Sequence, residues 1–166
     1  MPADPATLLQ LTSRWGGIAT SEFRGDTRVA LNKDQLLDAM RFLKDERGFD
    51  LLVDVTCVDY LNYRDAARRF GLVYLLANTV TNERLTVRVY LDEQDLAVPS
   101  MVPLWAGANW FEREAYDMFG VDFEGHPDLR RILMPEEFSA FPLRKDYPLQ
   151  GRGERHNFDR IARAEA

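Results

Sequence analysis

Three side chains in the second half of the chain, Glu112, Glu114 and His126, have the chemistry of a general acid or base. Two groups that serve one substrate must face the same space. Residues two apart on a helix point about 200° from each other, so Glu112 and Glu114 cannot share a substrate. His126 precedes a proline in a turn, where a structural hydrogen-bonding role is commoner than proton transfer, although an ordinary pKa of about 6.5 leaves the second role open. A free-standing enzyme is therefore the weaker interpretation, and turnover by the purified chain would support it.

These acidic residues lie in a stretch with the signals of a short helix. Asn109 is a good N-cap, and Glu112 can reach back to its backbone N–H as in a capping box. Gly120 stands where the left-handed residue after a helix belongs. Helical spacing puts an apolar stripe on one face: Phe111, Ala115, Met118 and Phe119. The opposite face is expected to be charged and to carry Glu112, Arg113, Glu114 and Asp117, with Arg113 and Asp117 at ion-pair spacing. Spacing alone is as consistent with a solvated surface as with a functional face.

After this helix the chain carries regularly recurring prolines, which exclude a long helix or a central strand over residues 121–149. We expect an extended strap here, laid over its own domain or over a partner. Its predicted apolar anchors are Leu129, Ile132, Leu133, Met134, Leu143 and Leu149. Its basic pairs, Arg130 with Arg131 and Arg144 with Lys145, suit the capture of carboxylates on this chain or another. Residues 150–166 are expected to form a charged, mobile tail.

Three segments in fixed order closely resemble the signature of a known family. They read Glu-Arg-Glu-Ala-Tyr-Asp-Met-Phe-Gly at 112–120, Gly-His-Pro-Asp-Leu-Arg-Arg-Ile-Leu-Met-Pro at 125–135 and Pro-Leu-Arg-Lys-Asp-Tyr-Pro-Leu at 142–149. The family is the 30-kilodalton subunit of respiratory complex I, which in bacteria is the C subunit of NADH-quinone oxidoreductase. Two departures stand out: Glu137-Phe138 replaces a usual Asp-Trp pair, and Phe141 stands where histidine or another residue often precedes Pro142.

The resemblance implies a structural subunit of a proton-translocating complex that passes electrons from NADH to quinone. Its implied partners are the quinone-site subunit and the subunit with the terminal iron–sulfur cluster. The complex is implied to use FMN, iron–sulfur clusters, NADH and quinone, with no cofactor or metal bound and no catalytic site on this chain. In this interpretation the charged helix face pairs with the strap or a partner, and His126, Arg130 and Arg131 fix the course of the strap. Arg144, Lys145 and Asp146 then bridge to the adjoining subunit. The alternative is the equivalent subunit of a membrane-bound hydrogenase or other quinone-linked dehydrogenase.

Composition limits the other functions. The net charge of −6 argues against general nucleic-acid binding. The chain has one cysteine, whereas an iron–sulfur cluster usually needs about four. Its two histidines lie too far apart in the sequence for the ligand spacing of a zinc site. No apolar run approaches the roughly 20 residues of a membrane-spanning helix, and the start lacks the features of a signal peptide. We therefore expect a cytoplasmic location, with peripheral attachment to the inner membrane through partners.

The first 120 residues are expected to form one α+β domain. Periodicity predicts a helix from Pro5, a hairpin over 18–23 and 27–31, and a helix that Asn32 and Gln35 open and that ends near Gly48. Further strands are expected over 51–60, 70–80 and 85–91, followed by a loop over 92–103. In the first of these, Leu51, Val53, Val55 and Cys57 should share the apolar face, with Cys57 as a core residue. This order indicates a two-layer fold with a mostly antiparallel sheet and an extended C-terminal strap.

Overall fold

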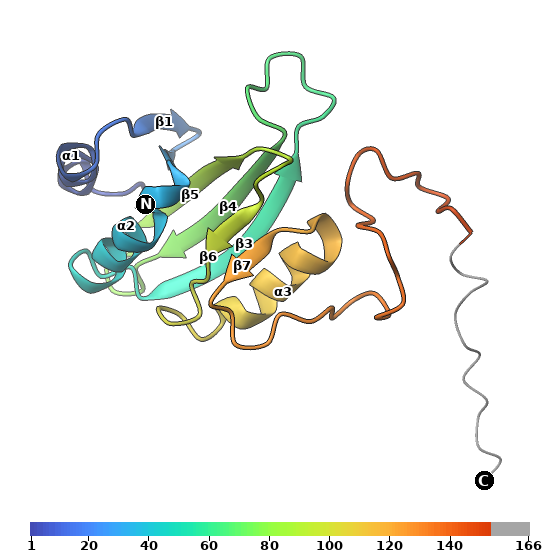
Figure 1. The fold of residues 1–166 in the computed structure, drawn as a ribbon. Coiled ribbons are helices and arrows are strands. Elements are labelled where there is room, and N and C mark those ends of the chain that lie inside the picture. Colours follow the sequence, from blue (N-terminus) through green and yellow to red (C-terminus); the bar gives the residue numbers. More distant parts are fainter. Residues whose placement is uncertain (154–166) are drawn as a thin grey trace, which may run out of the picture.

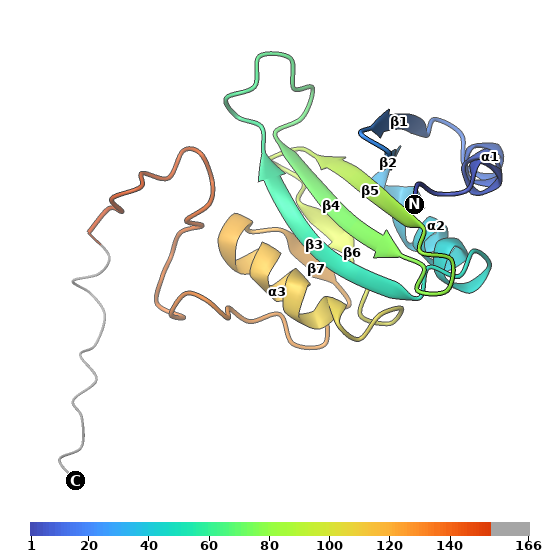
Figure 2. The same cartoon turned by 180° about the vertical axis from the view of Figure 1, so that it is seen from behind.

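The computed structural model describes residues 1–153 of the chain. Its elements are α1 (Pro5–Arg14), β1 (Ala19–Phe23), β2 (Asp26–Leu31), α2 (Lys33–Asp45), β3 (Leu51–Asp59), β4 (Phe70–Ala77), β5 (Arg84–Leu91), β6 (Ala97–Pro99), α3 (Ala108–Phe119) and β7 (Asp122–Glu124). Helices α2 and α3 and the short strands β6 and β7 pack against one face of the main sheet (Figures 1 and 2). The predicted two-layer α+β fold is confirmed.

The main sheet has the strand order β1-β2-β5-β4-β3. All neighbours are antiparallel except β2 and β5, which run parallel. Strand β4 lies between β5 and β3, and its side chains are mostly buried, as its almost continuous apolar sequence predicts. The central strands thus provide the rigid floor on which α3 and the strap are placed.

Local signals located the first elements correctly. The Asp4 carboxylate accepts a hydrogen bond from the Ala6 backbone N–H at 2.9 Å and caps α1, with Pro5 in the first turn. Gln35 accepts a hydrogen bond from the Asn32 backbone N–H at 3.4 Å at the start of α2. Each of these signals involves residues within three positions of one another, which is why the sequence alone shows them.

Strand β3 differs from its prediction at its start. The register against β4 shifts between Leu52 and Asp54, so a bulge lies at Val53. Leu51 and Val53 are therefore exposed, whereas Leu52, Val55 and Cys57 face the core. The prediction that Leu51 and Val53 share the buried face with Cys57 was wrong, because one extra residue reverses the alternation of a strand.

Three further boundaries also differ. Helix α3 follows Gly107 as its N-cap, so Asn109 lies inside the helix and is not the predicted cap. Within the segment expected to be a loop, β6 pairs in parallel with β7 at the start of the expected strap. Strands of three residues are too short to show alternation in a sequence. Residues 125–153 contain neither helix nor strand. Of the predicted mobile tail, residues 154–166 lie outside the described residues.

Candidate functional site

The structure buries two of the four charged residues predicted on the outer face of α3. The side chains of Glu112 and Asp117 have 0% exposure, whereas Glu114 is exposed and Arg113 is partly buried. The prediction of a uniformly charged, outward face is thus wrong for Glu112 and Asp117. The reason is tertiary: α3 is covered by the sheet on one side and by the strap and residues 100–101 on others.

Asp117 holds the middle of the strap. Its Oδ2 accepts hydrogen bonds from the backbone N–H groups of Ile132, Leu133 and Met134 at 3.1, 2.7 and 2.9 Å. Arg131 Nη1 donates to Oδ1 at 2.7 Å. Burial by itself would raise the pKa of Asp117, but the three N–H groups and Arg131 outweigh burial and hold this pKa below its ordinary value. A buried, ionised carboxylate therefore fixes the strap to α3.

Two arginines extend this contact. Arg113 Nε donates to the Arg130 carbonyl oxygen at 3.0 Å, and its Nη2 donates to that of Arg131 at 3.4 Å. Arg131 Nη2 donates to the Ala140 carbonyl oxygen at 3.1 Å. The predicted pairing of Arg113 with Asp117 is replaced by the pairing of Asp117 with Arg131. Both basic side chains thus bind strap backbone, as expected if the charged residues of α3 set the course of the strap.

Arg144 closes the C-terminal end of α3. Its Nε donates to the Phe119 carbonyl oxygen at 2.7 Å, where the helix dipole favours a cation. Its guanidinium carbon lies 4.6 Å from the ring centroid of Phe141 and 5.2 Å from that of Phe70. Gly120 has φ of +78°, and a Cβ on it would lie 2.6 Å from the Phe141 ring and 2.7 Å from Arg144 Nη2. Only glycine fits this junction without strain.

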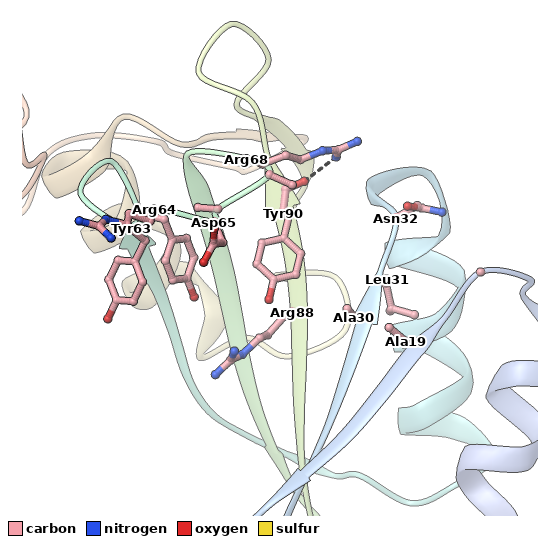
Figure 3. A pocket seen from close by; sticks show the side chains of 14 residues that line it. Ala19, Ala30, Leu31, Asn32, Tyr63, Arg64, Asp65, Arg68, Arg88 and Tyr90 are labelled. Carbon is pink, nitrogen blue, oxygen red and sulfur yellow. Dashed lines mark hydrogen bonds between the residues drawn. The ribbon is translucent and has the colours of Figure 1, made fainter.

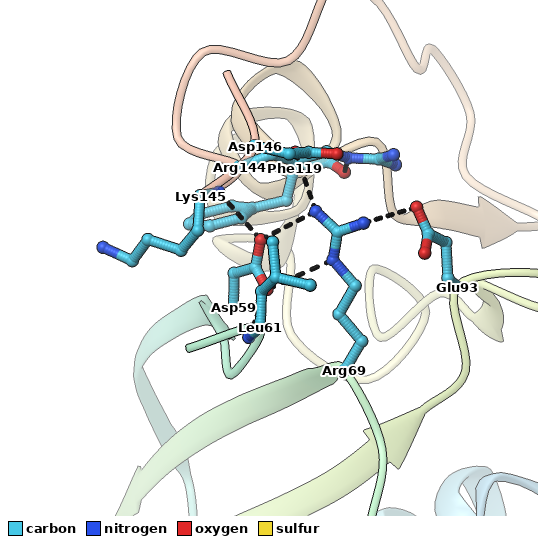
Figure 4. A network of polar contacts seen from close by, with 8 residues as sticks. All are labelled: Asp59, Leu61, Arg69, Glu93, Phe119, Arg144, Lys145 and Asp146. Carbon is cyan, nitrogen blue, oxygen red and sulfur yellow. Dashed lines mark hydrogen bonds and ion pairs between the residues drawn. The ribbon is translucent and has the colours of Figure 1, made fainter. Parts of the chain in front are cut away.

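A second ionic cluster ties the end of the strap to the sheet (Figure 4). Asp59, at the end of β3, is buried, and its Oδ2 accepts hydrogen bonds from Arg69 Nη2 at 3.1 Å and from the Lys145 backbone N–H at 2.9 Å. Arg69 also pairs with Asp146 at 2.7 Å and with Glu93. Burial would raise the pKa of Asp59, but Arg69 and the backbone N–H donors hold it below its ordinary value. The Asp146 carboxylate and the Lys145 backbone N–H are thus engaged within their own chain, whereas the Lys145 side chain is exposed.

Sequence reasoning missed Asp59 and Arg69 as members of this site. One signal was present: Asp59 stands two residues after Cys57 and therefore on the same, buried face of the strand. A carboxylate at such a position needs a paired cation and hydrogen bonds. Nothing in the sequence near Asp59 shows that the cation is Arg69, ten residues away across the β3–β4 connection.

Glu112 and His126 form a separate buried pair. Glu112 Oε2 accepts a hydrogen bond from Ser100 Oγ, and Oε1 accepts one from the Met101 backbone N–H, both at 2.6 Å. These bonds replace the predicted capping of Asn109. Burial raises the pKa of Glu112 to about 7, although both hydrogen bonds act against this rise. His126 Nε2 lies 4.0 Å from Glu112 Oε2.

The hydrogen bonds of His126 define its tautomer. Its Nδ1 accepts a hydrogen bond from the Asp128 backbone N–H at 3.0 Å, so the ring proton is on Nε2. Nε2 lies 3.3 Å from the Asn109 carbonyl oxygen of α3 and donates to it. Both ring nitrogens are thereby used to hold the turn after β7 on the helix, which is a structural arrangement.

The apolar residues of the strap divide into two groups. Leu129 and Met134 pack against the core, as predicted, and Phe138, which the sequence analysis did not count as an anchor, is buried. Leu133 and Leu143 are instead 59% and 50% exposed. The exposed group comprises Leu133, Leu143, Leu149 and the α3 residue Trp110. Leu133, Leu143 and Leu149 therefore do not anchor the strap on its own domain, contrary to the prediction.

The described part of the chain offers no group of three or more His, Cys, Asp or Glu side chains placed to hold a metal ion. Cys57 is buried in the core as predicted, and burial raises the pKa of its thiol to about 12. Among residues 1–153, no helix combines the length and apolar character that crossing a membrane requires.

Comparison with known proteins places this two-layer domain with a clamped strap in one class of respiratory protein. The family described as respiratory-chain NADH dehydrogenase, 30 Kd subunit, matches residues 29–153. The C subunit of NADH-quinone oxidoreductase from Trichlorobacter lovleyi is 47% identical over 130 residues, which cover 78% of this chain and 79% of that protein. The corresponding protein of Geobacter sulfurreducens is 44% identical over 130 residues, with 78% and 79% covered. The chain therefore belongs to the 30 Kd subunit family of respiratory-chain NADH dehydrogenase, which confirms the resemblance carried by residues 112–149.

Solved structures agree with this assignment. The trypsin-resistant fragment (1–134) of Nqo5 superposes with a TM-score of 0.68 at 36% identity, covering 74% of this chain and 99% of the fragment. A chain of the membrane-bound sulfane sulfur reductase, an archaeal respiratory membrane complex, superposes with a TM-score of 0.74 over 97% of this chain and 94% of its own. Its 23% identity shows a shared fold alone.

Proposed function

We propose that this chain serves as the 30-kilodalton subunit of an NADH-quinone oxidoreductase and acts by holding neighbouring subunits of the hydrophilic arm together. The family match over residues 29–153 supports the complex, and relatives that are 44% and 47% identical are named as parts of it. The partners we propose are the quinone-site subunit and the subunit with the terminal iron–sulfur cluster. The flavin, clusters and quinone then belong to other subunits, and the chain is peripheral on the cytoplasmic side of the membrane through its partners.

The observation that carries the interaction role is the outward-facing apolar side of a strap that its own domain holds in place. Leu133 and Leu143 are 59% and 50% exposed, although residues 132–134 and 143–145 are bound through their backbones to α3 and β3. Burying one leucine side chain contributes about 1.5–3 kcal/mol. A surface that is already ordered costs little further conformational entropy when a partner covers it.

The charged residues fall into two groups in this proposal. Asp117, Arg131 and Arg144 shape the strap from within, because each is bound to α3 or to strap backbone. Glu114, Arg130 and Lys145 have exposed side chains, and we assign them to the polar rim of the interface. Rim charges of this kind set orientation and the rate of association more than affinity. Removing a rim charge should therefore be milder than disrupting the apolar surface.

The test uses the tagged chain in its own host, with Leu133→Asp and Leu143→Asp as variants. Val80→Asp is the matched control, because Val80 is 87% exposed in the turn between β4 and β5. Membranes are solubilised gently, the co-purifying subunits are identified by mass, and NADH-quinone activity is measured. We expect iron–sulfur and quinone-site subunits with the unmodified chain and the control, and at least about tenfold lower recovery with the strap variants.

Three outcomes would contradict this proposal. Strap variants that assemble at the level of the Val80→Asp control would show that this surface is not an interface. Variants that assemble fully and lose quinone reduction would show a part in the chemistry instead. Recovery of hydrogenase subunits with the unmodified chain would move it to the alternative complex.

A further inference from the structure

A hollow of about 640 Å³ lies on the open face of the main sheet, away from α3 and the strap (Figure 3). The tyrosines Tyr60, Tyr63 and Tyr90 line one side of it, and the small residues Gly17, Ala19 and Ala30 line the other. This volume is within the range of about 300–1,000 Å³ that is typical of pockets for small molecules. The proposed assembly role uses none of these residues.

Arg88 of β5 is the central polar group of this hollow. Its neighbours across the sheet are Val73 of β4 and Ala30 of β2, so its side chain rises from the middle of the open face. Its Nε atom is buried, and no group among residues 1–153 accepts a hydrogen bond from it. In the part of the chain that the structure describes, the Arg88 guanidinium makes no ion pair. A buried donor without an acceptor is unfavourable by itself, and an anion in the hollow would satisfy it.

The charge of the residues that line the hollow also favours an anion. Three arginines, Arg64, Arg68 and Arg88, and one acidic residue, Asp65, line the hollow. Arg68 pairs with Asp92 at 3.7 Å, which leaves one excess positive charge. The whole chain has a net charge of −6, so this is a local reversal of sign. A concave, positively charged site concentrates anions.

The tyrosines add a cluster of aromatic rings beside Arg88, with the Tyr60 ring at 85° to that of Tyr63 and at 47° to that of Tyr90. Tyr60 lies directly on Gly71 of β4, where a Cβ would come within 2.7 Å of the Tyr60 ring. Its ring centroid is 5.4 Å from that of Tyr63 and 6.1 Å from that of Tyr90. Glycine at residue 71 thus makes room for the Tyr60 ring, and the cluster offers ring faces and edges to an aromatic ligand.

We propose that this hollow binds a small organic anion in which a carboxylate is attached to a flat apolar body. The carboxylate accepts hydrogen bonds from the Arg88 guanidinium, and the flat body lies along the tyrosines above Ala30. The proposed ligand is a free small molecule, because the volume of the hollow is typical of small-molecule pockets and, among residues 1–153, the Arg88 guanidinium has no ion-pair partner.

The test compares benzoate with benzamide on the purified full-length chain. The two probes have almost the same shape, but only benzoate is charged. Binding is measured by calorimetry, and the site by NMR shifts of the tyrosine rings and of the arginine Nε–H groups. We expect benzoate to shift signals of Arg88 and Tyr90 and to bind at least about tenfold more tightly than benzamide, since hydrogen bonds to charged groups contribute more than neutral ones.

Three variants identify the residues involved. Arg88→Gln should weaken benzoate binding by about tenfold or more. Arg28→Gln is the matched control, because Arg28 lies on β2, is partly buried like Arg88, and does not line the hollow. Ala30→Phe should block the hollow by volume and abolish binding while Arg88 keeps its charge. Thermal unfolding of each variant checks that it folds.

The proposal is overturned if benzoate does not bind, if benzamide binds equally well, or if Arg28→Gln weakens binding as much as Arg88→Gln. It is also overturned if Tyr63 is protected from nitration in the isolated complex without ligand. A neighbouring protein of the complex would then be the occupant of this face.

Discussion

Asp117 offers the sharpest test of how the strap is held. Replacing Asp117 with alanine removes the acceptor of three backbone N–H groups and of Arg131. Breaking a buried ion pair by removing one partner costs about 3–5 kcal/mol. Arg131 is partly exposed, so water can solvate some of the freed groups, and we expect the free energy of unfolding to fall by about 3 kcal/mol. Against a total stability of about 5–15 kcal/mol, this is a large change.

Urea unfolding of the full-length chain, followed by circular dichroism, measures this difference. With a slope of about 1–3 kcal/mol per molar urea, a loss of about 3 kcal/mol should lower the midpoint by about 1–3 M. Asp128→Ala is the matched control, because Asp128 also makes two 2.7 Å hydrogen bonds with an arginine, Arg130, but this pair is exposed. We expect the control to change little. If both variants lose the same stability, buried pairing at Asp117 is not what holds the strap.

Two further predictions concern α3. Gly120→Ala should lower the free energy of unfolding by about 1 kcal/mol or more, because Gly120 has a positive φ and an added Cβ would meet Phe141. Its melting temperature should fall accordingly. Gly107→Ala is the control and should change little, because among residues 1–153 no other atom lies within 4 Å of the added Cβ. Glu112 binds its proton more tightly in the folded chain, since its pKa rises from 4.5 to about 7, so stability should fall as the pH increases through that window. Glu112→Gln should remove this fall, so above pH 7 the variant should be more stable than the unmodified chain by roughly 3 kcal/mol. Urea midpoints at pH 5 and pH 8 measure the difference. If the midpoints of both proteins change equally between these pH values, the prediction is refuted.

Local sequence signals gave the most accurate predictions. Asp4 with Pro5, Asn32 with Gln35, and Gly120 marked helix ends that the structure confirms. The strands β4 and β5 were visible from runs and alternation of apolar residues. The motif of residues 112–149 identified the family before any geometry was known. These features depend on neighbouring residues, so they can be predicted without knowing what packs against them.

Only the tertiary structure decided which charged residues are buried and with which groups they pair. Glu112 and Asp117 have the spacing of a solvated face, yet other segments cover both. Asp59 binds the backbone of Lys145, 86 residues further along the chain. Arg88 is an ordinary strand residue in the sequence and becomes the centre of a hollow through the pairing of β2 with β5. Periodicity records which side of its own element a residue faces, whereas burial and pairing depend on what the rest of the chain places on that side.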